Sequence, residues 1–574
     1  MRRRALPAVI CVALCAGIPL HAGKKSTGPA AQFRQQIRKQ DRIAQALNRL
    51  TFGPRPGDAE RVRAMGLKKW LDRELHPERI AENPAIEAKL KALDSLAMSG
   101  EELVRNYPAP QIVRQMVAGQ IPFPTDPDRK LLIQRQAARL ERQQAQANGN
   151  APQMQVQALA GLLAPEQIRA LRTGTPEERL AAFQALSREW QDDVIAALPP
   201  ALRQGLMQVA PHELRRRIVL ANGPAQVVAQ DLMEAKLLRA IESNRQLAEV
   251  LADFWFNHFN VYLDKGADHY LVTAYERDAI RPHVLGRFRE LLEATAKSPA
   301  MLFYLDNWQS AAPGPAPARA PRRRGLNENY GRELLELHTL GVDGGYTQKD
   351  VTEVARCFTG WTINQPQRGG GFTFNARLHD TGEKVVLGVT IPAGGGMEDG
   401  EKVLDILARH PATAHFISRK LAQRFVADDP PSPLVDRMAE TFRKTDGDLR
   451  AVMQTMVGAR EFWSVGAYRT KVKKPLEVVA SAVRALNGEV AYALPLANQV
   501  AQLGEPLYRK VEPTGYSNAG RDWLSSAGLL ARMNFALQLA ANKVPGVKVE
   551  AGPAARADDP LAGLPLGSPE FQKH

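Results

Sequence analysis

Cysteine is nearly absent from this sequence. The 574 residues include three cysteines, and Cys11 and Cys15 lie in an N-terminal stretch that we expect to be removed. Cys357 would then stand alone, so no intramolecular disulfide could form and the fold must rest on its core. Because Cys357 lies beside the apolar stripe of a predicted helix, we interpret it as a buried small residue rather than a nucleophile.

The sequence also lacks the common catalytic motifs. It contains no P-loop, no G-x-S-x-G, no H-E-x-x-H, no C-x-x-C and no dinucleotide-binding fingerprint after a strand. Eleven histidines are present, but no two are spaced three or four residues apart on a helix. These absences argue against the common metalloproteases, serine hydrolases and redox enzymes. They leave open a site assembled from separated helices.

Long apolar runs are missing beyond the N-terminus. The first 23 residues combine MRRR, a short apolar run and the sequence LHA at 20–22, which is the pattern of a cleaved Sec-type signal peptide. The run is short for a membrane anchor. Ile10 and Leu14 precede the two cysteines where a lipoprotein signal would need a small residue. We expect cleavage near Ala22 and a periplasmic or secreted protein with no transmembrane segment, whose residues 24–40 are flexible.

Positive charge is in excess, but it is not concentrated. The formal charge is +15 and the isoelectric point about 9.7. A nucleic-acid-binding protein would usually place its basic residues on one element and interleave aromatics, and the sequence shows no such element. We therefore expect no nucleic-acid partner. Weak attraction to an anionic polymer of the cell envelope is the inference that the charge supports.

Helical periodicity dominates the chain. It predicts a mainly α fold, in which a multi-helical single large domain over residues 41–545 includes one small β-hairpin. Residues 131–230 are predicted as an outer helical insertion, and the Pro/Arg-rich residues 311–325 as a loop that is either a lid or a plain disordered insertion. Alternation over 372–391 predicts the hairpin, with its turn at 380–382. Residues 546–574 are predicted to be a disordered tail.

The richest stretch is residues 325–361. Its first helix is expected to start near Asn327, a good N-cap residue, and to stop at Gly341. A core face is predicted for Tyr330, Leu334 and Leu337, and an opposite polar stripe for Asn329, Arg332, Glu333 and Glu336. Arg332 and Glu336 form a predicted i,i+4 pair. His338 lies about 160° from Glu336 on an α-helix, so the two could not hold one metal ion.

A second helix is expected after a glycine turn. Thr347 and Asp350 form a predicted capping box, followed by an apolar face of Val351, Val354, Ala355 and Phe358. The turn lacks the ligand spacing of an EF-hand. Two interpretations of the helix pair stay open: a charged face exposed to water, or a stripe lining a polar cleft between buried helices.

The helix predicted near 244–262 is apolar on all sides in its second half. Asp253, Asn257 and His258 lie on it, so we expect low exposure for all three and hydrogen bonds to other segments. His258 is either a satisfied core histidine or part of a site. His379 and Asp380 are placed at the tip of the predicted hairpin, where they are either solvated or close over the cleft.

Several ordered blocks resemble the bacterial domain-of-unknown-function 1800 family. They are NYGRELLELHTLGV and GGYTQKDVTEVARCFTGW in the central stretch, LNRLTFGPRPGD (47–58), LADFWFNHFNV (251–261), SPAMLFYLDN (298–307), HDTGEKVVLG (379–388), KVKKPLEVV (471–479) and GYSNAGRDWLSSAGLLARMNFA (515–536). The resemblance spans about residues 40–540. It implies an exported, largely helical protein with no established activity, and offers a second exported, uncharacterised protein encoded nearby as a possible partner.

Two functional hypotheses follow. In the first, the protein is an envelope assembly or binding protein, and the polar residues form a buried network that fixes helix packing. In the second, it is a hydrolase-like or metal-assisted envelope enzyme acting on an extracellular polymer through Glu333 and Glu336. His338 and His258 are then further catalytic candidates, and the substrate-binding candidates are Asn257, Asn329, Arg332, His379 and Asp380. The sequence assigns neither a cofactor nor a metal.

Overall fold

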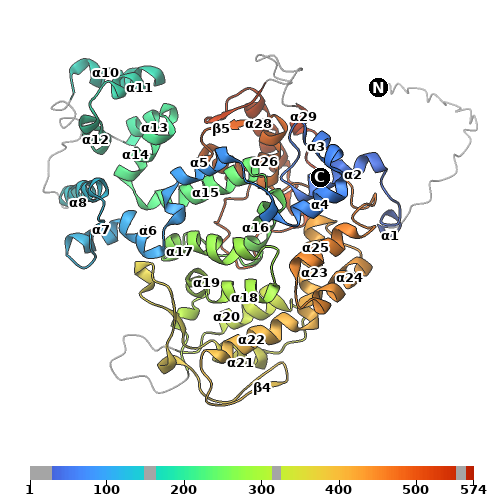
Figure 1. Cartoon of the computed structure of the whole chain (residues 1–574). Helices are drawn as coiled ribbons and strands as arrows, with labels where there is room; N and C mark the ends of the chain where they lie inside the picture. The colour runs from blue at the N-terminus through green and yellow to red at the C-terminus, as the bar shows by residue number, and fades with distance from the viewer. Residues whose placement is uncertain (1–28, 148–162, 199, 313–324, 551–563) are drawn as a thin grey trace, which may run out of the picture.

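The computed structural model describes residues 29–147, 163–198, 200–312, 325–550 and 564–574. The fold is mainly α, as predicted, and many of the helices surround one large apolar core (Figure 1). The first helices are α1 (Pro29–Gln32), α2 (Arg42–Leu50), α3 (Asp58–Met65), α4 (Leu67–Glu74), α5 (Pro84–Ala92), α6 (Gly100–Asn106), α7 (Pro110–Val117) and α8 (Pro127–Ala147).

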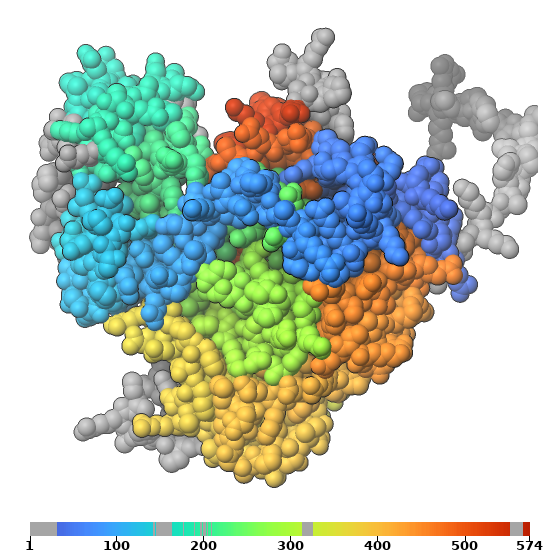
Figure 2. Space-filling model, viewed as in Figure 1, coloured from blue at the N-terminus to red at the C-terminus, as the bar shows by residue number. Residues whose placement is uncertain are grey.

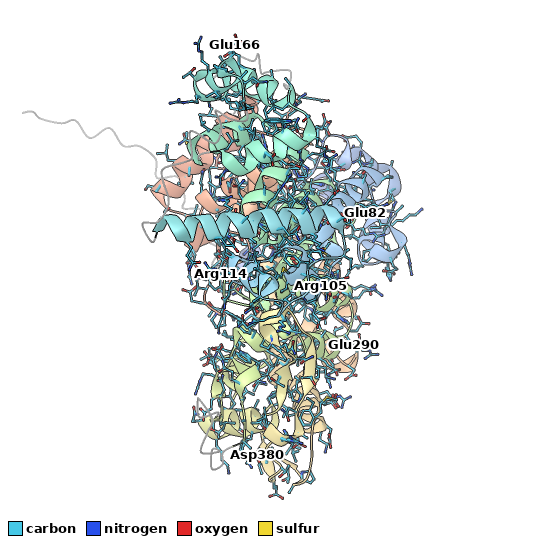
Figure 3. All side chains as sticks on the ribbon, turned by 90° about the vertical axis from the view of Figure 1, so that its left-hand side faces the viewer. Glu82, Arg105, Arg114, Glu166, Glu290 and Asp380 are labelled. Atoms are coloured by element: carbon cyan, nitrogen blue, oxygen red, sulfur yellow. The ribbon has the colours of Figure 1, made fainter. Side chains whose placement is uncertain are left out.

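An outer group of helices has a small apolar core of its own. Its members are α10 (Pro165–Thr173), α11 (Pro176–Gln184), α12 (Arg188–Ala197), α13 (Pro200–Val209) and α14 (His212–Asn222). They stand out from the body in the space-filling view (Figure 2), and α8 crosses the same side below Glu166 (Figure 3). Assignment of 131–230 as an insertion stays a prediction. Its last residues, 225–230, form the start of α15, where Val227 and Val228 are buried.

Two central helices cross the main core. α15 (Ala225–Glu242) and α16 (Gln246–His258) are buried along most of their length. Around them lie α17 (Asp268–Ala274), α18 (Phe288–Ala296), α19 (Pro299–Tyr304), α20 (Glu328–Glu333), α21 (Gln348–Cys357), α22 (Glu398–Arg409), α23 (Pro411–Phe425), α24 (Ser432–Lys444), α25 (Leu449–Gly458), α26 (Pro475–Ala485), α27 (Leu494–Gln502), α28 (Ser526–Ala540) and α29 (Leu564–Gly567). No helix in the described ranges combines the length and the apolar character needed to span a bilayer.

The small β-structure differs from the prediction. There are three two-stranded antiparallel sheets in the described chain rather than one hairpin: β1 (Trp361–Ile363) with β2 (Phe372–Phe374), β3 (Lys384–Val386) with β4 (Val389–Ile391), and β5 (Glu489–Val490) with β6 (Val547–Lys548). The turn between β3 and β4 is at Leu387 and Gly388, not at 380–382. Both residues have positive φ, 49° and 80°, as a tight two-residue hairpin turn requires.

The predicted flexible N-terminal segment is wrong for residues 29–40. Ile37 is buried, its amide donates to the carbonyl of Trp463 at 2.9 Å, and Gln36 pairs with Ser464. The hydrophobic effect explains why this segment packs against the body, because the apolar side chain of Ile37 is transferred from water into the core. Residues 24–28 and the predicted signal peptide lie outside the described residues.

The predicted disordered tail also needs correction. Val547 belongs to β6, and Gln572 and His574 are buried. The amide of Lys473 donates to the carbonyl of Gln572 at 2.9 Å, so this stretch is held by backbone hydrogen bonds as well as by burial. Residues 551–563 lie outside the described residues, as do residues 313–324 of the predicted Pro/Arg-rich loop. The flanks of that loop meet, because the amide of Ala311 donates to the carbonyl of Gly325 at 3.2 Å.

Candidate functional site

The local signals of the central helix pair are confirmed. The Asn327 side chain accepts from the amide of Asn329 at 2.9 Å and caps α20, and Gly341 has a φ of 82° beyond the end of the helix. Thr347 and Asp350 form the expected capping box of α21. These features depend on neighbours in sequence, which is why the sequence predicts them well.

The first helix is not α-helical throughout. From Leu334 to Thr339 it widens into a π-helical turn, where the amide of Leu340 donates to the carbonyl of Leu335 and the hydroxyl of Thr339 donates to the carbonyl of Leu334. The wider turn buries Leu335 as well as Leu334, whereas Leu337, predicted to be in the core, is only partly buried. π-Helical turns interrupt α-helices often at functional sites.

The predicted pair of Arg332 and Glu336 does not form. Arg332 donates to the Gln348 side chain at 2.8 Å and lies 3.8 Å from Glu328, while Glu336 accepts from the Tyr346 hydroxyl at 3.2 Å. The π-helical turn rotates Glu336 relative to the position that an α-helix would give it. Arg332 therefore faces the preceding turn and the start of α21.

The polar stripe lies at the surface. Asn329 is exposed, and Arg332, Glu333 and Glu336 are half-buried. Burial, with the charge of Glu336 adding to it, raises the pKa of the Glu333 carboxyl. The stripe is therefore neither fully solvated nor enclosed between two buried helices.

His258 and His338 meet in the core. Each is 2% exposed, their ring centres are 6.3 Å apart, and His258 Nε2 lies 3.1 Å from the carbonyl of His338. Burial, with the charge of Lys420, lowers the pKa of both imidazoles, that of His338 to about 3. Within the described part of the chain, His258 Nδ1 and His338 Nε2 have no hydrogen-bond partner. Among the described residues, no group of three or more His, Cys, Asp or Glu side chains could hold a metal ion.

The expected burial of Asp253 and Asn257 is confirmed. Asp253 lies 3.0 Å from Lys236 and 3.3 Å from Lys474, and both lysines are buried. Burial opposes the charge of Asp253, but these lysines more than offset it and hold the pKa of the carboxyl below its usual range. Lys474 also faces Glu505 at 3.7 Å. Sequence reasoning missed both lysines, although the KVKKP block places Lys474 just before α26.

Asn257 holds a distant loop. Its side chain donates to the carbonyl of Tyr516 at 2.8 Å and accepts from the Tyr516 amide at 2.6 Å. Asn260 donates to the carbonyls of Lys510 and Glu512, and the Tyr304 hydroxyl donates to the carbonyl of Val511. The end of α16 therefore fixes the backbone of residues 510–516.

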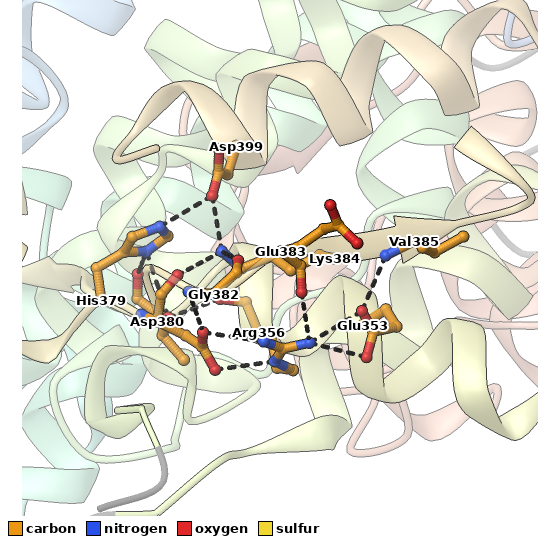
Figure 4. A network of polar contacts seen from close by, with 10 residues as sticks. Glu353, Arg356, His379, Asp380, Gly382, Glu383, Lys384, Val385 and Asp399 are labelled. Carbon is orange, nitrogen blue, oxygen red and sulfur yellow. Dashed lines mark hydrogen bonds and ion pairs between the residues drawn. The ribbon is translucent and has the colours of Figure 1, made fainter. Parts of the chain in front are cut away.

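His379 and Asp380 are not at a hairpin tip. His379 is 6% exposed and Asp380 half-buried, and both lie in a network between α21, β3 and α22 (Figure 4). Asp380 forms a bidentate ion pair with Arg356. His379 Nε2 and Lys384 Nζ both reach Asp399 Oδ2, at 3.2 and 2.8 Å.

Thr359, His379 and Asp399 have the outline of a nucleophilic triad but not its chemistry. Thr359 Oγ1 lies 3.3 Å from His379 Nδ1. The same Nδ1 is nearer to the carbonyl of Thr359, at 2.7 Å, so it bears a proton and donates. Thr359 Oγ1 itself donates to the carbonyl of Arg356 at 2.6 Å. No imidazole lone pair faces the hydroxyl, and the threonine is not activated.

Cys357 is fully buried beside this network. Burial raises the pKa of its thiol to about 12, so the thiolate is absent at neutral pH. The interpretation of Cys357 as a core residue rather than a nucleophile agrees with this environment.

The candidate residues thus fall into separate groups. His258 and His338 are enclosed, His379 and Asp380 belong to the α21–β3–α22 network, and the Glu333–Glu336 stripe lies at the surface. In comparisons with known proteins, no curated protein and no solved structure matches this chain. The model of the DUF1800 family, described as proteins of unknown function, matches residues 45–572. The chain belongs to the DUF1800 family.

Proposed function

We propose that this protein is an exported assembly or binding protein of the bacterial cell envelope, and that it contacts its partner through one side of α28. We call this surface the α28 face and define it by Leu524, just before the helix, and by Leu529, Leu530 and Met533 on it. These residues are between 42% and 59% exposed, and they are four of the eleven large apolar side chains that are exposed in the described part of the chain. This clustering is the observation that carries the proposal.

The α28 face is the outer side of a helix that is buried on one side only. Leu529, Leu530 and Met533 share one side of α28, while Phe535 and Leu539, four residues apart, bury the other in the core. Single exposed apolar residues are ordinary on protein surfaces, but a cluster is typical of a binding site. Because these leucines are already about half buried, covering one would contribute roughly half of the value for a fully exposed leucine, or about 1 kcal/mol.

The buried polar residues support the same function. The bonds of Asn257 and Asn260 fix residues 510–516, and the Tyr516 ring lies 5.9 Å from that of Trp523, just before the α28 face. The polar side chains at the end of α16 and just beyond it therefore position a surface rather than line a reaction site.

Export and the partner remain parts of the proposal. The N-terminal signal pattern supports the envelope, and the charge of +15 supports contact with an anionic envelope polymer. A second exported, uncharacterised protein encoded nearby is the protein partner we favour. An apolar partner surface would fit the α28 face better than a purely charged polymer does.

A photo-crosslinking amino acid at position 530 tests the proposal in the native host. We expect one discrete adduct with an envelope protein, recovered from the periplasmic fraction, because Leu530 is 59% exposed on the α28 face. The same amino acid at Val342, which is 69% exposed on another part of the surface, is the matched control. Equal adduct patterns at both positions, or recovery from the cytoplasm, would contradict the proposal.

The alternative is an envelope enzyme that uses Glu333 and Glu336. One observation favours it: the two carboxyl groups flank the start of a π-helical turn, and burial raises the pKa of Glu333. A raised carboxyl pKa suits a general acid. The α28 face does not depend on these residues.

Glu333→Gln separates the two functions. Because the folded pKa of Glu333 lies above its unfolded value, the ionised carboxyl opposes folding, and stability falls as pH rises through the folded pKa. Substitution should therefore change the free energy of unfolding at neutral pH by no more than about 0.5 kcal/mol, without loss. We expect Glu333→Gln and Glu336→Gln to complement a deletion strain fully. Loss of complementation at unchanged thermal stability would favour the enzyme.

A further inference from the structure

A cavity of about 250 Å³ lies among α2, α3, α4, the turn between α15 and α16, and α26. Six charged side chains line it: Arg55, Asp58, Arg61, Arg73, Glu74 and Arg484. Val62, Met65 and Trp70 supply an apolar wall. None of these residues belongs to the groups considered above. We call this space the Glu74 cavity.

Positive charge around the Glu74 cavity is only partly balanced. Four arginines face two acids, and Arg55 and Arg484 both donate to the carbonyl of Ile241. Burial, together with the charge of Arg55, lowers the pKa of Arg484 to about 9. Burial also lowers the pKa of Arg55. Arg484 is buried and Arg55 is half-buried. Two such guanidinium groups that share one acceptor repel each other, and an anion nearby would relieve that repulsion.

Asp58 is the counter-charge that lines the cavity beside these arginines, and more than one of them shares it. It forms an ion pair with Arg61 and lies 3.6 Å from Arg484. Glu242, outside the lining, adds attraction to Arg55. Arg73 is exposed at the edge of the cavity. The arginines therefore retain capacity for a further anionic partner.

Glu74 is an acid of the cavity whose pKa lies near neutral pH. It is 6% exposed, and its Oε2 accepts from the amide of Leu247 at 2.9 Å. The other carboxyl oxygen of Glu74, Oε1, accepts no hydrogen bond from the described residues. It is not among the fully buried atoms that lack a partner, so it can be reached from the cavity. Burial raises the pKa of Glu74 to about 7, although Arg484 and Arg73 oppose the shift and Asp58 adds to it.

The charges facing Glu74 come from several elements. Arg484 is on α26, Asp58 and Arg61 are on α3, Arg55 precedes α3, and Arg73 is on the same helix as Glu74. The neighbouring turn and α16 contribute neutral side chains to the lining: Ser243, Asn244 and Gln246. When Glu74 is protonated, the positive excess of the cavity grows by one charge and the carboxylic acid becomes a hydrogen-bond donor.

We propose that the Glu74 cavity binds a small organic carboxylate. The arginines supply positive charge, protonated Glu74 donates a hydrogen bond to the ligand carboxylate, and Val62, Met65 and Trp70 contact its apolar part. The volume suits a ligand well below the size of a typical drug-sized molecule. Binding then takes up a proton at Glu74, so affinity falls as pH rises.

Calorimetric titration of the full-length mature protein with benzoate tests this site. Benzoate combines a carboxylate with an apolar ring and keeps its charge across the neutral range. Since only the protonated fraction of Glu74 would bind, the affinity should fall about tenfold between about pH 6 and about pH 8. Glu74→Gln keeps an acceptor for the Leu247 amide, and this variant should bind with the same affinity at both pH values.

Two further variants keep the test interpretable. Arg61→Gln removes a guanidinium that is largely exposed, so it should fold normally and weaken benzoate binding at both pH values. Glu60→Gln alters an exposed carboxyl on the same helix that does not line the cavity, and should bind as the wild type does. Absence of benzoate binding to the wild type, or an unchanged pH dependence in folded Glu74→Gln protein, would overturn the proposal.

Discussion

Asp253→Ala is expected to lower the free energy of unfolding by about 3–5 kcal/mol, the usual cost of removing one partner from a buried ion pair. Asp253 and its partner Lys236 have side chains about 11% and 9% exposed. Without the carboxylate, Lys236 remains in the core without its ion pair at 3.0 Å, and the charge of Glu276 attracts it only from a greater distance. Lys474 is less affected by the loss of the carboxylate, because the carboxyl group of Glu505 still lies 3.7 Å from it. Urea unfolding of the two proteins measures the difference.

A double variant that removes both charges of the Asp253–Lys236 pair is the control for this loss of stability. Asp253→Leu combined with Lys236→Met replaces both ions by apolar side chains of similar size, which is often neutral or stabilising. We expect the double variant to recover most of the stability that Asp253→Ala loses. A loss of less than about 1 kcal/mol in Asp253→Ala would show that the lysines do not depend on this carboxylate.

The same ion pair predicts a pH dependence. The folded pKa of Asp253 lies below its unfolded value, so its contribution to stability is present above the unfolded pKa. The contribution is lost as the pH falls from that value toward the folded pKa. Wild-type protein should therefore lose stability on acidification more steeply than Asp253→Ala. Urea midpoints across the acidic range would check the slope.

Asp399→Asn should be nearly as severe, lowering the free energy of unfolding by about 3 kcal/mol or more. The side chains of Lys384 and Asp399 are 0% and 1% exposed, and their ion pair is 2.8 Å long. Asparagine retains the shape and the acceptor oxygen, but it leaves the lysine charge unbalanced in the core. The carbonyls of Asp380 and Gly382 still accept from Lys384, and they supply no full counter-charge.

Thermal unfolding measures the loss, and hydrogen exchange locates it. We expect faster exchange of the amides of residues 379–391, because Asp399 ties this segment to α22 (Figure 4). Asp446→Asn is a matched control on a surface ion pair: Asp446 is about half exposed and lies 3.3 Å from Arg287. That change should cost less than about 1 kcal/mol. Equal losses of stability in Asp399→Asn and Asp446→Asn would contradict the prediction that the ion pair of Asp399 stabilises the fold.

The sequence by itself determined the local elements of this protein. The cap at Asn327, the capping box of Thr347 and Asp350, and the left-handed Gly341 all depend on residues within a few positions. The second half of α16 has apolar residues on every side, and this pattern predicted that Asp253, Asn257 and His258 would be buried. These expectations needed no knowledge of the partners.

The partners were decided only by the tertiary structure. Lys474 is 221 residues from Asp253, and Asp399 lies 15 residues beyond Lys384 across two strands and a turn. The π-helical turn that separates Arg332 from Glu336 and the docking of residues 29–40 depend on contacts with distant segments. Periodicity reports which face of an element is buried, but not which element covers it, because the burial free energy depends on area and not on sequence distance.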